Sequence, residues 1–92
     1  MTMTKQKPNP GNQTHNQQEN MLDLILYNDD VNTFEFVIET LIEVCQHNPE
    51  QAEQCALLAH MKGRCPVKNG AADMLMPMKS EMNMRGLIAT IE

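Results

Sequence analysis

The feature that most limits the fold of this chain is a short apolar run, residues 22–27 (LDLILY), followed closely by an amphipathic helical pattern. The run is apolar at most positions, as in a strand that is buried in a sheet. Turn-forming residues, Asn28-Asp29-Asp30, end it. Apolar side chains then recur at the spacing of one helical face, at Phe34, Val37, Ile38, Leu41 and Cys45. A strand that turns sharply into a one-faced helix predicts a sheet packed against helices.

Two helices are predicted from their end signals. Asn32 can cap the first, and Glu35 three residues later completes a capping-box pattern. The second is predicted to begin at Asn48-Pro49, a capping residue followed by proline at the first helical position. It is predicted to end near Lys62, with Gly63 in the left-handed conformation after it.

A second strand is predicted after these helices. Residues 64–68 (RCPVK) can form it, although Pro66 confines it to an edge or a bulge because proline has no N–H to donate to a ladder. Asn69-Gly70 is a turn signal, so the strand is expected to end before it.

The remaining residues predict one more helix and one more strand. Residues 71–85 suggest a helix in which Pro77 marks either a kink or the true start. Gly86 closes this helix, and residues 87–91 (LIATI) form a β-branched terminal strand. The order β-α-α-β-α-β predicts the α+β class, with a small three-stranded antiparallel sheet packed on three helices.

The N-terminal residues differ in composition from the rest. Residues 1–20 contain no large apolar residue except Met1 and Met3, and Asn, Gln, Thr and Pro dominate. Such a segment cannot bury enough surface to offset the entropy lost on ordering. We therefore expect a disordered tail at residues 1–20 and one core domain at residues 21–92.

Charge and hydropathy exclude several classes of protein. The net charge is −5, and because residues 1–20 carry two lysines and one glutamate, residues 21–92 carry −6. Nucleic-acid binding needs clustered Lys and Arg instead. There is no apolar run of about eighteen residues and no apolar core of a signal peptide. Three widely spaced cysteines also suit a reducing compartment. We expect a cytoplasmic protein that binds neither nucleic acid nor membrane.

Three segments in order resemble the ClpS family, small bacterial and plastid adaptors that deliver proteins with destabilising N-terminal residues to AAA+ Clp proteases. The segments are residues 26–30 (LYNDD), 34–37 (FEFV) and 59–64 (AHMKGR), and residues 87–92 match the terminal strand. The resemblance implies the α+β fold that this family shares with the C-terminal domain of the ribosomal stalk protein. Residues 71–85 match poorly, so no ATPase-docking residue is transferred from the family.

The resemblance also implies a binding site for a protein N-terminus (an N-degron). A free α-amino group is a compact cation with three donors, which needs acceptors around it. The resemblance assigns this role to Asn28, Asp29 and His60. It assigns a pocket for the first side chain to apolar residues with two polar residues at the rim: Asp30, Asn32, Phe34, Val37, Ala56, Ala59 and Leu87. Many family members carry Met at the positions of Ala56 and Phe34, which leaves the preferred first residue open.

The implied partners are the N-terminal domain of a Clp AAA+ ATPase, of the ClpA or ClpC type, and proteins with bulky hydrophobic N-terminal residues. The family's use of an N-terminal extension to engage the ATPase suggests that role for residues 1–20. No cofactor, metal or catalytic residue is implied, and we expect no enzyme activity.

Two other kinds of function remain as alternatives. The methionines between residues 74 and 84 are soft ligands that could bind Cu(I), although methionine more often fills irregular space in a core. A ribosomal-stalk-like interaction domain would share the fold, but its partner-binding surface is lysine-rich. For an enzyme, Cys55 and His60 lie too far apart around one helix, and nothing orients His60 toward Cys65 as a catalytic pair requires.

Overall fold

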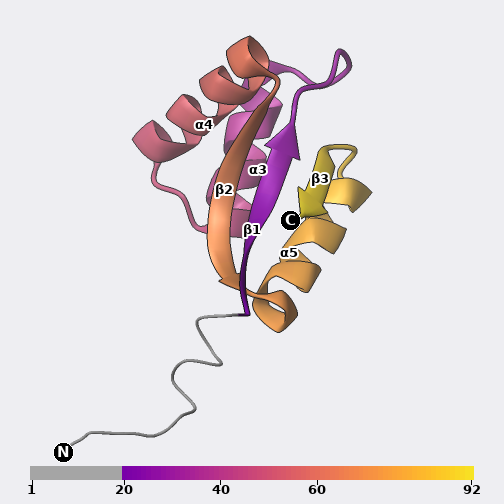
Figure 1. Ribbon diagram of the computed structural model, residues 1–92. Coiled ribbons are helices and arrows are strands. Elements are labelled where there is room, and N and C mark those ends of the chain that lie inside the picture. Colours follow the sequence, from indigo (N-terminus) through magenta and orange to yellow (C-terminus); the bar gives the residue numbers. More distant parts are fainter. Residues whose placement is uncertain (1–19) are drawn as a thin grey trace, which may run out of the picture.

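The structure is a computed structural model that describes residues 20–92. Its elements are β1 (Met21–Tyr27), α3 (Phe34–Cys45), α4 (Pro49–Lys62), β2 (Arg64–Ala71), α5 (Ala72–Met84) and β3 (Ile88–Ile91) (Figure 1). This order confirms the predicted α+β class. The tail expected at residues 1–20 lies outside the described residues except for Asn20. Among residues 20–92, none of the helices is long and apolar enough to cross a membrane.

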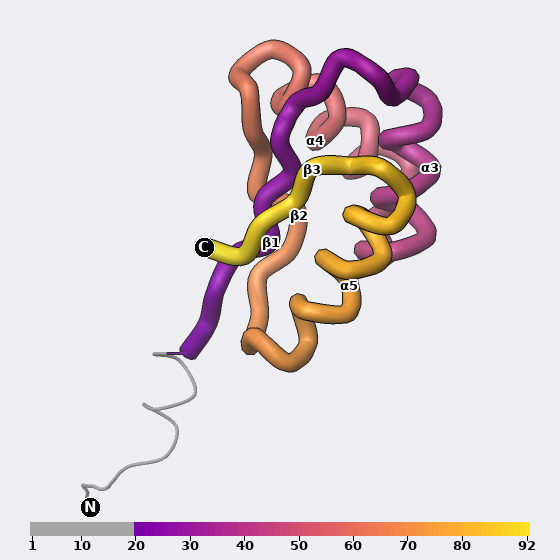
Figure 2. Tube along the Cα trace, turned by 90° about the vertical axis from the view of Figure 1, so that its right-hand side faces the viewer, coloured from indigo at the N-terminus to yellow at the C-terminus, as the bar shows by residue number. Residues whose placement is uncertain are grey.

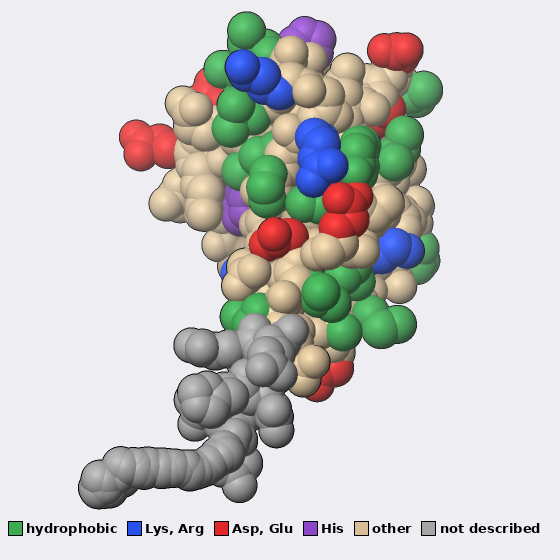
Figure 3. Space-filling view, in the orientation of Figure 1, with side chains coloured by type: hydrophobic (Ala, Val, Ile, Leu, Met, Phe, Trp, Pro, Cys, Tyr) green, Lys and Arg blue, Asp and Glu red, His purple; other side chains and the backbone are tan. Residues whose placement is uncertain are grey.

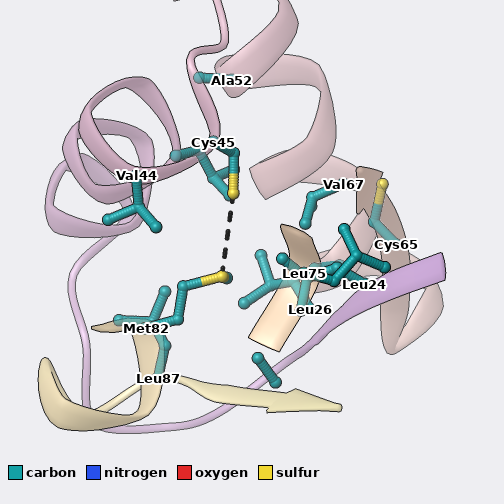
Figure 4. Packing of buried hydrophobic residues seen from close by; sticks show 13 residues of the cluster. Leu24, Leu26, Val44, Cys45, Ala52, Cys65, Val67, Leu75, Met82 and Leu87 are labelled. Carbon is teal, nitrogen blue, oxygen red and sulfur yellow. Dashed lines mark hydrogen bonds between the residues drawn. The ribbon is translucent and has the colours of Figure 1, made fainter. Parts of the chain in front are cut away.

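The three strands form one antiparallel sheet in the order β2-β1-β3, with β1 in the middle. All three helices lie on one side of this sheet (Figure 2). Side chains of a strand alternate between its two faces, so Leu24 and Leu26 face the helices and are almost fully buried. They pack with Leu41 of α3 and with Leu75 and Met82 of α5 (Figure 4). Burying each leucine contributes about 2 kcal/mol to stability.

Strand β2 is an edge strand that also contains a bulge, so both expectations from Pro66 are met. Leu24 pairs with Lys68 and Ile25 pairs with Pro66, which leaves Val67 as the extra residue. The carbonyl of Val67 accepts a hydrogen bond from Nε2 of the buried His47, at 2.7 Å. This bond joins the α3–α4 junction to the bulge.

The predicted turn at Asn69-Gly70 is wrong, because β2 continues through both residues to Ala71. Asn69 pairs with Asp23 of β1, and its side-chain amide donates to the Leu22 carbonyl at 3.0 Å and to Asp23 at 2.9 Å. A Cβ at position 70 would meet the end of the Met74 side chain, which would have to move. Strand partners therefore override the local turn preference.

The first helix is capped by Thr33 and not by Asn32 as predicted. Oγ1 of Thr33 accepts a hydrogen bond from the Phe36 N–H at 3.1 Å. The Asn32 side chain instead donates to Asp29 and to the Gly86 carbonyl. Tertiary contacts thus take Asn32 away from the helix end.

The other predicted helix ends are confirmed. Asn48 caps α4 by accepting from the Gln51 N–H at 2.7 Å, and Pro49 is the first helical residue. Gly63 follows with φ of 96°. Helix α5 begins before Pro77 and continues through it, so Pro77 does not mark the start. Gly86 follows α5 with φ of 93°.

Charged side chains of both signs are interspersed on the face shown in Figure 3. One charged group joins all three strands: Arg64 of β2 lies 3.2 Å from Glu92, just after β3, and Nη1 of Arg64 donates to the Tyr27 hydroxyl of β1 at 3.3 Å. The Tyr27 hydroxyl itself donates to Glu92. Among the described residues, the face shown in Figure 3 has no large basic patch of the kind that nucleic-acid binding needs.

Candidate functional site

A cavity of about 570 Å³ opens where the end of β1, the loop of residues 28–33, the start of α3 and the second half of α4 meet. This volume is in the range of pockets that hold small molecules or single large side chains. Its lining residues are Leu26, Tyr27, Asn28, Asp29, Asp30, Asn32, Phe34, Val37, Ala56, Leu57, Ala59 and His60.

Nine of the ten residues that the sequence analysis assigned to the site line this cavity, and Leu87 does not. Leu87 is 3% exposed and belongs to the core cluster, because it follows the turn at Gly86 and packs inward toward the helices. Leu87 is therefore a core residue and not a pocket residue as the sequence analysis expected.

The sequence analysis missed Leu57, which lines the cavity at the same level as Ala56 and is 41% exposed. Its spacing could have revealed it. Leu57 precedes His60 by three residues, so the two lie on one face of α4. A leucine three residues before the assigned histidine was the available signal in the sequence.

The Asp29 carboxylate organises the loop at the cavity mouth. Oδ1 accepts hydrogen bonds from the N–H groups of Val31 and Asn32, both at 2.8 Å. Oδ2 accepts from the Asn32 side-chain amide at 3.1 Å. Burial raises the pKa of Asp29, but the hydrogen bonds from Asn32 and Val31 lower it by more, so this pKa lies below its ordinary value. Asp29 is therefore a carboxylate at neutral pH.

Two further bonds fix this loop to the rest of the domain. The N–H of Asn28 donates to the Gly63 carbonyl at 3.0 Å, which ties the end of β1 to the end of α4. The amide of Asn32 donates to the Gly86 carbonyl at 2.9 Å, which ties the loop to the turn before β3. The rim of the cavity is thus held from both sides.

The second carboxylate, Asp30, differs from Asp29 in its surroundings. Asp30 is exposed, and among residues 20–92 its carboxylate makes no hydrogen bond or ion pair. Asn28 and His60, both exposed, line the cavity near it. The rim therefore presents a carboxylate, an amide and an imidazole, all of which can accept hydrogen bonds from a cation.

The residues raised in the alternatives lie in different surroundings. Within residues 20–92 no three His, Cys, Asp or Glu side chains could hold a metal ion together. The methionines of α5 point different ways: Met82 is buried and its Sδ accepts from the Cys45 thiol at 3.9 Å (Figure 4), whereas Met76 and Met84 are exposed. Burial raises the pKa of the Cys65 thiol to about 12, so Cys65 is not an activated nucleophile.

Comparison with known proteins identifies the family. A family model described as ATP-dependent Clp protease adaptor protein ClpS matches residues 17–90. The chain is 44% identical over 43 residues to the ClpS adapter of Nitratidesulfovibrio vulgaris, covering 47% of this chain and 43% of that protein. It is 43% identical over 51 residues to the Campylobacter jejuni ClpS adapter, covering 55% and 53%. It thus spans about half the length of these curated relatives.

A solved structure supports the same conclusion for the fold. Agrobacterium tumefaciens ClpS2 bound to L-phenylalaninamide superposes with a TM-score of 0.69 at 23% identity, covering 79% of this chain and 95% of that one. The resemblance seen in the sequence is therefore confirmed, and the chain belongs to the ClpS family of ATP-dependent Clp protease adaptor proteins.

Proposed function

We propose that this protein is a non-catalytic adaptor that binds proteins through a bulky hydrophobic N-terminal residue and delivers them to a Clp AAA+ ATPase-protease in the cytoplasm. The observation that carries this proposal is the cavity, whose lining combines apolar side chains with hydrogen-bond acceptors. The apolar residues include Val37, Ala56 and Ala59, and the acceptors are Asn28, Asp30 and His60. A protein N-terminus has the matching chemistry, since its cationic amine lies one carbon from its first side chain. Agrobacterium ClpS2, which has the same fold, was solved with L-phenylalaninamide, a free amine with an aromatic side chain.

The same rim explains how the ends of chains can be distinguished from their interiors. A backbone amide within a chain carries no charge and has one donor, so it leaves most of the rim acceptors without partners. Covering such acceptors without satisfying them costs more free energy than their hydrogen bonds contribute. Binding is therefore expected only for a free α-amine.

The amine is proposed to lie among Asn28, His60 and the two carboxylates. A carboxylate has about four acceptor positions, and Asp29 already uses three of them for Val31 and Asn32. Asp29 can thus offer about one position, whereas Asp30 offers both oxygens. We propose that Asp30 is a principal contact of the amine and that Asp29 mainly holds the loop. This differs from the expectation drawn from the sequence, which assigned the amine to Asp29 and placed Asp30 at the pocket rim.

The direct test is fluorescence anisotropy with labelled peptides that differ only in their first residue. Peptides that begin with Leu, Phe, Tyr or Trp are expected to bind. An N-acetylated copy of the tightest peptide is expected to bind about a hundredfold more weakly, because it loses buried, charge-assisted hydrogen bonds worth roughly 3 kcal/mol. Equal affinity for the acetylated and free peptides would refute the proposal.

Delivery needs a separate test with a purified Clp ATPase, of the ClpA or ClpC type, and its peptidase. The full chain is expected to speed degradation of a reporter that begins with phenylalanine and to leave a reporter beginning with methionine unaffected. A chain of residues 21–92 is expected to bind peptide normally but to lose the acceleration, since residues 1–20 are proposed to engage the ATPase. Full acceleration by the shortened chain would exclude that role.

A further inference from the structure

Helix α4 contributes Ala56, Leu57, Ala59 and His60 to the cavity lining, and the side chain of Ala56 is a single methyl group. Ala56 is 4% exposed, yet it is not part of the core cluster that contains Ala52 and Ala59 of the same helix. Because Ala56 lines the cavity, its methyl group faces the open space. The volume beyond this methyl group is therefore left for a ligand.

A ligand side chain that fills that space binds more tightly. Each pair of atoms in contact contributes a little dispersion energy, and a gap beside the ligand forfeits it. Leucine has four side-chain carbons, whereas the rings of Phe, Tyr and Trp cover a larger area. A side chain as small as that of Ala56 therefore favours a first residue with a ring over leucine.

Helix α3 contributes to the cavity lining an aromatic side chain that is not part of the core. Phe34, at the start of α3, is 38% exposed and lies outside the residues that pack on the core cluster. It lines the cavity, although the chain has only two Phe, one Tyr and no Trp. Two rings in offset or edge-to-face contact attract each other beyond the effect of their buried area.

These two observations, together with the function proposed above, lead to one inference. We propose that the cavity selects protein N-termini that begin with Phe, Tyr or Trp over those that begin with Leu, with Ala56 setting its depth and Phe34 contacting the bound ring. The substrate class is thus aromatic N-termini. Ala56 and Phe34 act as specificity-determining residues, separate from the polar rim that binds the amine.

The test compares dissociation constants of free-amine peptides that differ only in a first Phe, Trp or Leu. For the unchanged protein, the aromatic peptides are expected to bind about three- to tenfold more tightly than the Leu peptide, the range for one aromatic pair. Ala56→Met extends a side chain into the cavity and is expected to reduce the Trp-to-Leu ratio at least threefold. Phe34→Leu removes the ring at an exposed position and is expected to bring the Phe-to-Leu ratio near one.

Gln54→Met is the matched control for Ala56→Met. It introduces the same side chain on the same helix at an exposed position outside the cavity lining, so all ratios are expected to stay unchanged. Thermal unfolding of each variant confirms that it is folded. If Ala56→Met does not fold, Phe34→Leu alone decides the role of the aromatic contact.

The outcomes separate this inference from the proposed function. Leu binding as tightly as Phe and Trp in the unchanged protein overturns the aromatic preference while the adaptor function stands. Unchanged ratios in folded Ala56→Met and Phe34→Leu overturn the two residue assignments. Binding of no free-amine peptide overturns both proposals.

Discussion

The backbone N–H of Asn32 and its side-chain amide both donate to the carboxylate of Asp29, at 2.8 and 3.1 Å. The same amide also donates to the carbonyl of Gly86. These bonds hold Asp29 in the loop and leave the neighbouring Asp30 as the carboxylate without a partner among the described residues. Two adjacent residues of one type therefore have different surroundings, and their substitutions should differ.

Alanine substitutions at the two positions form a matched pair. Asp30→Ala is expected to weaken peptide binding roughly tenfold or more, because one charge-assisted interaction is lost, while the free energy of unfolding changes by less than about 0.5 kcal/mol. Asp29→Ala removes the acceptor of three hydrogen bonds and is expected to lower the free energy of unfolding by about 1 kcal/mol as well as the affinity. Anisotropy and urea unfolding measure the two quantities. Normal binding by Asp30→Ala would show that Asp30 does not contact the amine.

The lowered pKa of Asp29 predicts how stability depends on pH. Its pKa in the folded protein lies below the ordinary value of 3.8, so the carboxylate stabilises the fold above the pKa of the unfolded chain. This contribution is lost as the pH falls through the lower, folded-state value. In Asp29→Asn the thermal midpoint is therefore expected to fall less steeply below about pH 4.

Glu92 also contributes to the loss of stability in acid and has to be considered in this measurement. The hydrogen bond from Tyr27 lowers the pKa of Glu92 as well, so acid weakens that contact with the same sign. The slope in Asp29→Asn should consequently be reduced and not abolished, and Glu92→Gln should reduce it further. An identical acid slope in wild type and Asp29→Asn would contradict the assignment of these hydrogen bonds.

Two left-handed helix ends predict opposite effects of glycine. Gln46 ends α3 with φ of 57°, a conformation that costs a residue with a Cβ roughly 1 kcal/mol, so Gln46→Gly is expected to stabilise the protein by up to that amount. Gly63 ends α4 with φ of 96°, and Gly63→Ala is expected to destabilise by about 1 kcal/mol although nothing lies within 4 Å of the added Cβ. Urea unfolding measures both. Destabilisation by Gln46→Gly would mean that its side-chain bond to the Val44 carbonyl outweighs the backbone strain.

Burial predicts which of the three cysteines reacts first. Burial raises the pKa of Cys45 to about 11 and that of Cys65 to about 12, and only the thiolate is nucleophilic. Cys55 is only partly buried. Iodoacetamide at pH 8 is therefore expected to modify Cys55 in the folded protein and all three thiols in urea, as measured by peptide mass spectrometry. Early modification of Cys65 would show that β2 opens readily from α4.

Several elements of this fold could be predicted from the sequence because their signals are local. Asn48 and Pro49 meet the needs of a helix start within three residues, and Gly63 and Gly86 each supply the positive φ that follows a helix. The short apolar run of β1 and the helical spacing of apolar residues in α3 can both be read from neighbouring residues alone. The turn at Asn28 and Asp29 could be predicted because it follows directly from the end of a recognisable strand, whereas the role of these residues in binding was implied only by the resemblance to the ClpS family.

Only the tertiary structure decided the roles of residues for which the local sequence allowed two. Asn69-Gly70 has the composition of a turn, but Asp23 and Leu22 of β1 supply strand partners that no nearby residue could. Asn32 could cap a helix, but Asp29 and the distant Gly86 take its amide, and Thr33 caps instead. Leu87 could line the pocket or the core, and the turn before it directs it into the core. Local sequence determines which conformations a residue can adopt cheaply, and long-range hydrogen bonds and packing select among them because each is worth as much as the local preference it opposes.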